Sequence, residues 1–408
     1  MLFMATTINY MDRQVIAILK PTIEHSIGMS ELDYSYVVDA FQIAYTLGLL
    51  AAGRFVDRVG TRIGYMAVMA IWSLSAMGHA LADSVITFAI ARFSLGLGES
   101  GNFPAAIKTV AEWFPQRERS LAIGIFNSGS TVGAVLAPLL IPWAAARFGW
   151  HAAFLVTGCF SSFWVVWWCR SYRRPSLHPR LNPSELHYIL DGLPEETGAS
   201  APWLSLLGYR QTWAFAVGKF LTDPIWWFYL FWLPSFFTHR FHLNLLHLGL
   251  PLMLVYAGSA VGSIGGGWLP TLFRSLGLSS DRARLASMLL FACLVVPIFL
   301  VNYLQSEWVV IGLLSLAAAA HCGWSANIFA LPSDMFPRSA VGSVTGIGGM
   351  AGSAGGILLA TSTGLILQLT HSYASLFYIA SGTYLLSFIL IVLLAPGFRR
   401  AEFTPKAP

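Results

Sequence analysis

Two adjacent charged residues, Asp12 and Arg13, stand inside the apolar run that opens the chain. The run reads MLFMATTINYMDRQVIAIL, which is about the length of one membrane-crossing helix. A charge near the centre of a bilayer costs roughly 3 kcal/mol or more, so it is kept where it faces the protein interior or a watery path. A second pair, Arg92 and Glu99, lies in the fourth apolar run. Because membrane proteins use such groups to move ions or polar solutes, these residues indicate a transporter.

The spacing of the second pair favours one shared helix face. Arg92 and Glu99 are seven residues apart, so two helical turns place them about 10 Å apart along the axis. A carboxylate in such a place can take up and release a proton as its access to water changes. The alternative is a static ion pair that only holds helices together.

The composition is typical of a membrane protein. Hydrophobic residues make up 56% of the 408 positions and charged residues 11%, against roughly a quarter in a soluble domain. The net charge of +5 comes from basic residues in short loops, not along one groove, so we expect no nucleic-acid partner. The four cysteines are scattered through apolar runs, so we predict no disulfide framework, no metal site and no cofactor.

Twelve apolar segments divide the chain, and we predict an all-α integral membrane protein with twelve transmembrane helices. The segments lie near residues 1–20, 33–56, 64–82, 85–108, 119–146, 150–170, 212–237, 247–272, 285–304, 308–331, 341–368 and 373–396. The polar stretch at 171–210 is the loop long enough to join two six-helix halves. We therefore predict an N-terminal half at 1–170, a cytoplasmic linker at 171–210 and a C-terminal half at 211–408.

A short internal repeat supports the two halves. WFPQRERSLAIG at 113–124 resembles MFPRSAVGSVTG at 335–346, and the prolines Pro115 and Pro337 are 222 residues apart. Each copy precedes a glycine-rich apolar segment. The repeat predicts that the same supersecondary unit occurs once in each of two pseudo-symmetric halves.

The basic residues predict the orientation in the membrane. Of the 24 lysines and arginines, eighteen lie in the even-to-odd connections and the carboxyl tail, three lie on the opposite side, and three lie within the membrane. Cytoplasmic loops carry the excess of Lys and Arg. Both termini should therefore be cytoplasmic.

The connection between the second and third segments reads GRFVDRVGTR at residues 53–62 and resembles the loop motif of the major facilitator superfamily. We expect Gly53 to let helices approach closely and Asp57 to precede a helix start, where a negative charge is favoured. Arg58 and Arg62 can bind carboxylates or carbonyls at the inner face and so lock one conformation. The alternative is an ordinary basic cytoplasmic turn.

Further motifs resemble the anion:cation symporter family within that superfamily, and the resemblance covers nearly the whole chain. NYMDR at 9–13 and RFSLGLGESGNFP at 92–104 are the more specific matches. KFLTDPIWWFYLFWLP at 219–234, SDMFP at 333–337 and GIGGMAG at 346–352 are similar to its hexuronate transporter branch.

The resemblance implies roles for residues of the first half. Arg13 has a planar donor fork suited to a sugar-acid carboxylate, and we expect it to be an unpaired cation that Asp12 partly neutralises until the solute binds. Tyr10 and Tyr45 match positions that contact the solute, and Arg92 is placed with these substrate-binding residues. Asp12 and Glu99 match the proton-carrying carboxylates.

The second half offers candidates that each have an alternative interpretation. Lys219 is a second cation for the anion, or it pairs with Asp223 four residues later. Trp324 and Asn327 could stack on and hydrogen-bond a sugar, or they are a packing tryptophan and a helix-linking asparagine. His321 lies 222 residues after Glu99 and is either a proton group or a satisfied interior histidine.

The combined interpretation is a secondary active transporter of the bacterial inner membrane. It predicts proton-coupled symport of a hexuronate, glucuronate or galacturonate, by alternating access. The alternative is a symporter or facilitator of another organic anion, such as an aldonate, an aldarate or an aromatic acid. Neither a nucleophile–base set nor a motif of the HExxH or GxSxG type is found, so we expect no enzyme. The expected partners are the organic anion, protons and the lipid bilayer, and we expect a monomer.

Overall fold

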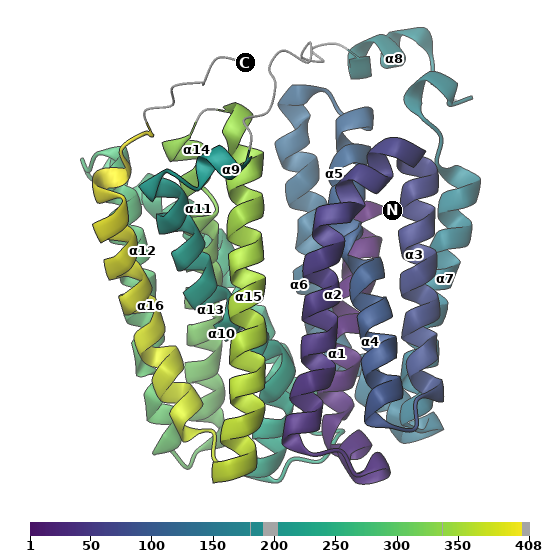
Figure 1. Ribbon diagram of the computed structural model, residues 1–408, viewed down its shortest axis with the longest axis vertical. Coiled ribbons are helices and arrows are strands. Elements are labelled where there is room, and N and C mark those ends of the chain that lie inside the picture. Colours follow the sequence, from purple (N-terminus) through teal and green to yellow (C-terminus); the bar gives the residue numbers. More distant parts are fainter. Residues whose placement is uncertain (180, 191–202, 337, 402–408) are drawn as a thin grey trace. The chain divides into compact units, whose positions relative to one another are not determined.

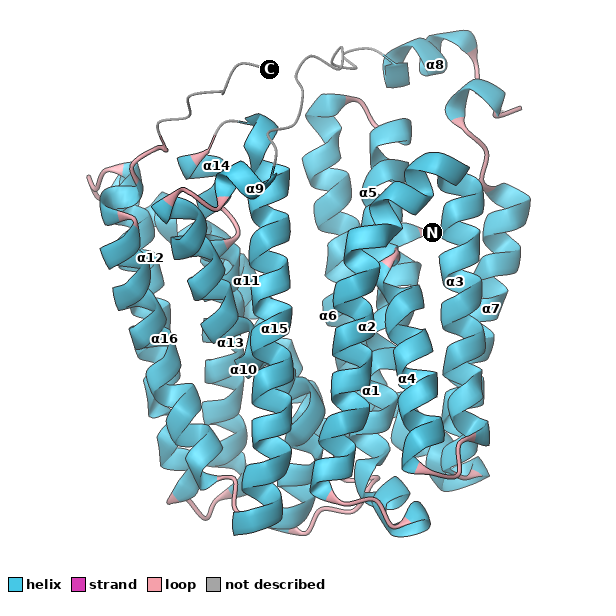
Figure 2. Cartoon of the chain, in the orientation of Figure 1, coloured by secondary structure: helices cyan, strands magenta, loops and turns pink. Residues whose placement is uncertain are grey.

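The computed structural model describes residues 1–179, 181–190, 203–336 and 338–401. Part of the predicted linker at 171–210 lies outside the described residues, as do Arg180 and Lys406 among the basic residues and Pro337 of the repeat. Within the described ranges every regular element is a helix, and no strand occurs (Figure 2). The prediction of an all-α protein is confirmed.

The chain divides into two units. The first comprises Met1–Thr197 together with Phe237–Met253, and the second comprises Gly198–Phe236 together with Leu254–Pro408. The first unit holds the short helix α8 (Pro183–Leu190) and seven longer helices: α1 (Leu2–Ile27), α2 (Glu31–Val59), α3 (Thr61–Gly78), α4 (Val85–Ser100), α5 (Asn102–Trp113), α6 (Gln116–Phe148) and α7 (Trp150–Ser171). Within this unit α2 packs along α4, α1 along α6 and α3 along α7 (Figure 1).

The turn between α1 and α2 has clear local causes. Gly28 ends α1 in the left-handed conformation, with φ +71°, which a glycine adopts without a steric cost. Ser30 and Asp33 then form a capping box that satisfies free N–H groups at the start of α2. The turn makes α1 and α2 antiparallel neighbours, and both helices carry predicted binding residues.

The second unit contains the remaining helices, with the ends of two of them belonging to the first unit. In chain order they are α9 (Trp203–Leu206), α10 (Arg210–Phe241), α11 (Gly249–Ser275), α12 (Ser280–Val295), α13 (Glu307–Ile328), α14 (Leu331–Met335), α15 (Arg338–Thr370) and α16 (Ala374–Leu394). A 3-10 segment at Val296–Asn302 extends α12, which packs against α13 and α16.

Length and composition identify most of the predicted membrane spans. Among the described residues, eight helices are long and apolar enough to cross a bilayer, and a ninth is counted if the bent pair Glu31–Leu49 and Ala51–Val59 is one span. The other three predicted spans fall on α1, on α4 with the first half of α5, and on α10. With 16 residues, α4 is short for a span by itself, whereas α1 and α10 carry the buried charges Arg13 and Lys219, which lower their mean hydropathy. The count of twelve spans stays a prediction.

The two copies of the repeat adopt the same local conformation. Phe114 (φ −121°, ψ 135°) and Phe336 (φ −126°, ψ 153°) are both extended, and each follows the end of a helix. A proline comes next in the sequence at both places, and a residue before proline is pushed out of the helical region. The same sequence signal therefore ends α5 and α14.

Candidate binding site

A buried ion pair joins α1 to α4 in the first unit. Arg13 Nη2 and Nε donate to Glu99 Oε2 at 2.7 and 3.0 Å, although the two residues are 86 positions apart. The two side chains are only 4% and 0% exposed. The expectation that Arg13 is an unpaired cation is wrong, because a charge this deeply buried needs a partner of opposite sign.

Aromatic rings surround the Arg13 guanidinium. Its Cζ atom lies 5.1 Å from the ring centre of Tyr10, 4.9 Å from that of Tyr45 and 5.2 Å from that of Phe41. Asn9 Oδ1 accepts a hydrogen bond from Nη2 at 3.3 Å. The two tyrosines predicted to contact a solute are thus brought together on the cation that was predicted to bind its carboxylate.

Arg92 supports this arrangement from α4. Its Nη2 donates to the main-chain carbonyl of Arg13 at 3.2 Å, and its guanidinium lies 5.0 Å from the ring centre of Phe41. Arg92 and Glu99 are both buried on α4, as expected from the cost of a charge within the bilayer. The ion-pair partner of Glu99, however, comes from α1.

Asp12 has partners other than Arg13. Its Oδ2 accepts hydrogen bonds from Trp72 Nε1 at 2.6 Å and from Ser161 Oγ at 2.9 Å. These two bonds link α1 to α3 and α7, and the expected partial neutralisation of Arg13 by Asp12 stays a prediction. Sequence reasoning missed Trp72 and Ser161. The sequence feature that could have identified these two residues is a side chain with a hydrogen-bond donor within an apolar run.

The cation of the second unit is also paired. Lys219 Nζ lies 2.7 Å from Asp223 Oδ2, one turn along α10, and 3.7 Å from the ring centre of Phe329. This is the i, i+4 pair that the spacing allowed.

Trp324 and Asn327 join α13 to neighbouring helices. Trp324 Nε1 donates to Thr222 Oγ1 of α10 at 3.2 Å. Asn327 Nδ2 donates to the carbonyls of Gly266 on α11 and Gly323 on α13, at 3.0 and 2.9 Å. These contacts correspond to the packing tryptophan and the helix-linking asparagine.

His321 is enclosed by aromatic neighbours. Its Nδ1 hydrogen-bonds the hydroxyl of Tyr384, and its ring stacks on Trp226 with centroids 5.0 Å apart. The arrangement corresponds to a satisfied interior histidine. In the described part of the chain, no group of three or more His, Cys, Asp or Glu residues could hold a metal ion.

The loop motif at 53–62 is held by contacts within the first unit. Asp57, in the last turn of α2, pairs with Lys108 of α5 at 2.7 Å. Arg62 Nη2 donates to the carbonyl of Cys169 on α7 at 2.8 Å, the kind of bond expected for it. Arg58 is exposed in the last turn of α2.

The close approach expected at Gly53 is not seen among the described residues of the first unit, where a Cβ atom at Gly53 would meet no atom within 4 Å. The close approach lies instead at Gly64 on α3, where a Cβ would be 3.0 Å from the Cα of Val56 on α2. Glycine spacing in the sequence could not distinguish these two positions.

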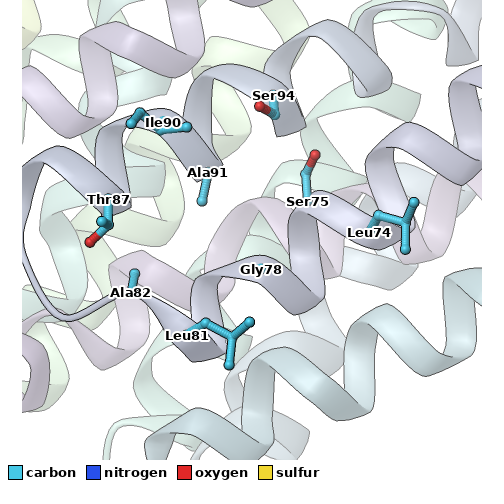
Figure 3. Close-up of a pocket in the computed structure, with 9 residues that line it drawn as sticks. All are labelled: Leu74, Ser75, Gly78, Leu81, Ala82, Thr87, Ile90, Ala91 and Ser94. Carbon is cyan, nitrogen blue, oxygen red and sulfur yellow. The ribbon is translucent and has the colours of Figure 1, made fainter.

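A pocket of about 400 Å³ lies between α3 and α4 (Figure 3). Its lining is mostly apolar, and Ser75, Thr87 and Ser94 contribute hydroxyl groups. None of the predicted site residues, all of which the structure describes, lines this pocket. We therefore assign the candidate binding site of the first unit to the residues around Arg13.

Comparisons with known proteins identify the family of the chain. The model of the Major Facilitator Superfamily matches residues 2–360. The chain is 31% identical over 393 residues to a hexuronate transporter of Escherichia coli (strain K12), covering 95% of this chain and 91% of that protein. It is 35% identical over 274 residues to a galacturonate transporter of Dickeya chrysanthemi, covering 66% and 79% respectively. The crystal structure of a D-xylose-proton symporter shares the fold, with a TM-score of 0.76, 15% identity and 97% coverage of both chains. The chain therefore belongs to the major facilitator superfamily and is a membrane transporter, not an enzyme.

Proposed function

We propose that the protein carries a hexuronate, glucuronate or galacturonate, together with protons across the bacterial inner membrane by alternating access. The observation that carries the proposal is the buried Arg13–Glu99 ion pair, which is ringed by the two tyrosines Tyr10 and Tyr45. The names of the two curated relatives, a hexuronate and a galacturonate transporter, support the substrate class.

Competition for one guanidinium couples the solute to a proton. A sugar-acid carboxylate suits the same Nε and Nη2 donors that Glu99 Oε2 now occupies. If the solute displaced an ionised Glu99, two negative charges would share one buried cation and Glu99 would lose its partner, which is costly. Protonation of Glu99 removes this cost. Binding of the anion and binding of the proton therefore favour each other, by the same factor in both directions.

The neighbouring residues receive supporting roles. Tyr10 and Tyr45 carry hydroxyl groups that can hydrogen-bond those of a sugar. Arg92 holds the main-chain carbonyl of Arg13 and so positions the cation. Asp12, with its donors on α3 and α7, is assigned as a second proton site.

The second unit and the loop motif complete the proposal. Lys219 is kept as a further cation for the anion, and Trp324 and Asn327 are kept as sugar contacts. Asn327 Oδ1 has no partner among the described residues and can accept a hydrogen bond from a sugar hydroxyl. The Asp57–Lys108 pair and the bond from Arg62 hold the ends of α2, α3, α5 and α7, which we assign to the conformational lock. Both termini are proposed to be cytoplasmic and the transporter to be a monomer.

Uptake by the purified protein in liposomes tests the function. With an imposed proton gradient, labelled glucuronate or galacturonate should accumulate above its external concentration, and neutral glucose or galactose should compete poorly. A panel of aldonates, aldarates and aromatic acids tests the alternative substrates. If one of those acids competes more strongly than the hexuronates do, it becomes the proposed substrate. Equilibration without accumulation would indicate a facilitator, and strong competition by neutral sugars would overturn the sugar-acid assignment.

A further inference from the structure

Two buried glutamines of the first unit have no hydrogen-bond partner for their amide groups. Gln14 on α1 is 1% exposed and Gln42 on α2 is 2% exposed. Neither Oε1 nor Nε2 of either side chain finds a partner among the residues that the structure describes. Burial of an amide without a partner is unfavourable, and native proteins keep such groups where another state or a ligand satisfies them. Asn327 differs from them because its Nδ2 donates to two carbonyls, and only its Oδ1 is without a partner among the described residues.

Each glutamine is one helical turn from a tyrosine that contacts Arg13. Gln14 follows Tyr10 by four residues on α1, and Gln42 precedes Tyr45 by three residues on α2. Residues at these spacings are neighbours on one helix face. The rings of both tyrosines lie over the Arg13 guanidinium, at 5.1 and 4.9 Å. Each glutamine therefore lies on the face of its helix that carries the tyrosine next to Arg13.

Gln14 and Gln42 also lie at similar distances along their helices from the turn that joins α1 and α2. Gln14 is fourteen residues before Gly28, and Gln42 is twelve residues after Ser30, on either side of the turn between the antiparallel helices. At the helical rise of 1.5 Å per residue, both lie about 20 Å from that turn. Arg13 lies about 22 Å from it by the same measure. The backbone positions of the two glutamines and of Arg13 are thus at nearly one level along the helices.

We propose that Gln14 and Gln42 bind the hydroxyl groups of the transported acid and select hydroxylated carboxylates over carboxylates with an apolar body. An amide both donates and accepts, as a sugar hydroxyl does, so each glutamine can pair with such a group through both of its ends. A site built to hydrogen-bond a hydroxyl rejects an analogue that lacks it, because its own polar groups then remain unpaired. The inference rests on the proposed function, since it takes Arg13 as the anchor of the carboxylate.

Methionine variants separate this role from a structural one. Gln14→Met and Gln42→Met keep the length of the side chain and remove the amide. Because the empty protein then loses an unpartnered buried polar group, its unfolding temperature should stay the same or rise. Its dissociation constant for glucuronate should rise about tenfold. A purely structural glutamine would show the opposite pattern, with a lower unfolding temperature and unchanged affinity. Gln42→Asn, which withdraws the amide by one methylene group, should also weaken glucuronate binding and serves if the methionine variant fails to fold.

The test measures binding and thermal unfolding of the full-length protein with glucuronate, galacturonate and cyclohexanecarboxylate, which has a similar size but no hydroxyl groups. The Met variants should lose affinity for the two sugar acids while their affinity for cyclohexanecarboxylate stays within about twofold of wild type. Gln368→Met, at an exposed position of α15, is the matched control and should change neither quantity.

The outcomes distinguish this inference from the function on which it rests. If the wild-type protein binds glucuronate and both Met variants bind it equally well, the glutamines do not contact the solute and only this inference is overturned. Equal losses of affinity for the sugar acids and for cyclohexanecarboxylate would also overturn it. If the wild-type protein binds neither sugar acid, the proposed function and the inference both fail.

Discussion

Replacing Glu99 by Gln is the sharpest test of the coupling argument. Glu99 Oε2 accepts two hydrogen bonds from Arg13, and a glutamine oxygen can still accept them, but without its negative charge. Breaking a buried ion pair costs about 3–5 kcal/mol, and the retained hydrogen bonds each return about 1 kcal/mol. The variant should therefore be about 1–3 kcal/mol less stable than the wild type, as measured by denaturant unfolding.

The effect on transport follows from the charge that the variant leaves behind. The guanidinium of Arg13 no longer has an ionised protein partner, so an anionic solute meets no competitor and should bind about tenfold more tightly, a gain of about 1.4 kcal/mol. Because no proton is exchanged at position 99, a proton gradient should no longer drive accumulation. Exchange of labelled for unlabelled solute across the membrane should remain.

Three measurements on the reconstituted Glu99→Gln variant test the proton-coupling role of Glu99: binding affinity, gradient-driven uptake and solute exchange. Asp334→Asn is the control, because it removes one partner of the Arg284–Asp334 pair, whose side chains are 20% and 35% exposed. That change should cost at most about 1 kcal/mol and leave accumulation intact. Full proton-driven accumulation by Glu99→Gln would refute the role of Glu99, and unchanged affinity would refute the competition for Arg13.

Three further substitutions have direct expectations. Arg13→Lys should reduce the initial rate of hexuronate uptake severely, since an ammonium group cannot reproduce the two-pronged contact; near-normal uptake would remove Arg13 from the site. Trp72→Phe removes the indole N–H that Asp12 accepts at 2.6 Å and should lower the free energy of unfolding by about 1–3 kcal/mol, whereas an unchanged thermal midpoint would contradict that bond. Gly98→Ala places a Cβ atom 2.6 Å from the main-chain nitrogen of Trp72 and should cost about 1–3 kcal/mol in denaturant unfolding, with a stable variant showing that α3 and α4 can separate.

The helices and the buried charges were predictable from local sequence. Apolar runs of membrane-spanning length predicted the long helices, and charges within those runs marked Arg13 and Glu99. The four-residue spacing of Lys219 and Asp223 allowed the pair that forms. Each of these features depends on neighbours along the chain.

Partners that are distant in the sequence were not predictable. Nothing local relates Arg13 to Glu99 across 86 positions, or Asp12 to Trp72 and Ser161, because helix packing decides which side chains meet. The unpartnered amide of Gln42 was likewise invisible, since an isolated polar residue in an apolar run gives no sign of whether it is bonded.

The charged cluster formed by Arg13 and three neighbouring charged residues determines whether transport carries an electric current. The side chains of Asp12, Arg13, Arg92 and Glu99 are all buried, and at their ordinary charges they sum to zero. If one hexuronate enters with one proton, the loaded cluster is again neutral, so neither the loaded nor the empty protein moves net charge when it reorients. If two protons enter, the loaded cluster carries one positive charge, and a membrane potential of 100 mV changes the energy of that step by up to about 2.3 kcal/mol. A transport current during uptake would therefore indicate two protons for each acid. Uptake without a current would indicate one proton for each acid.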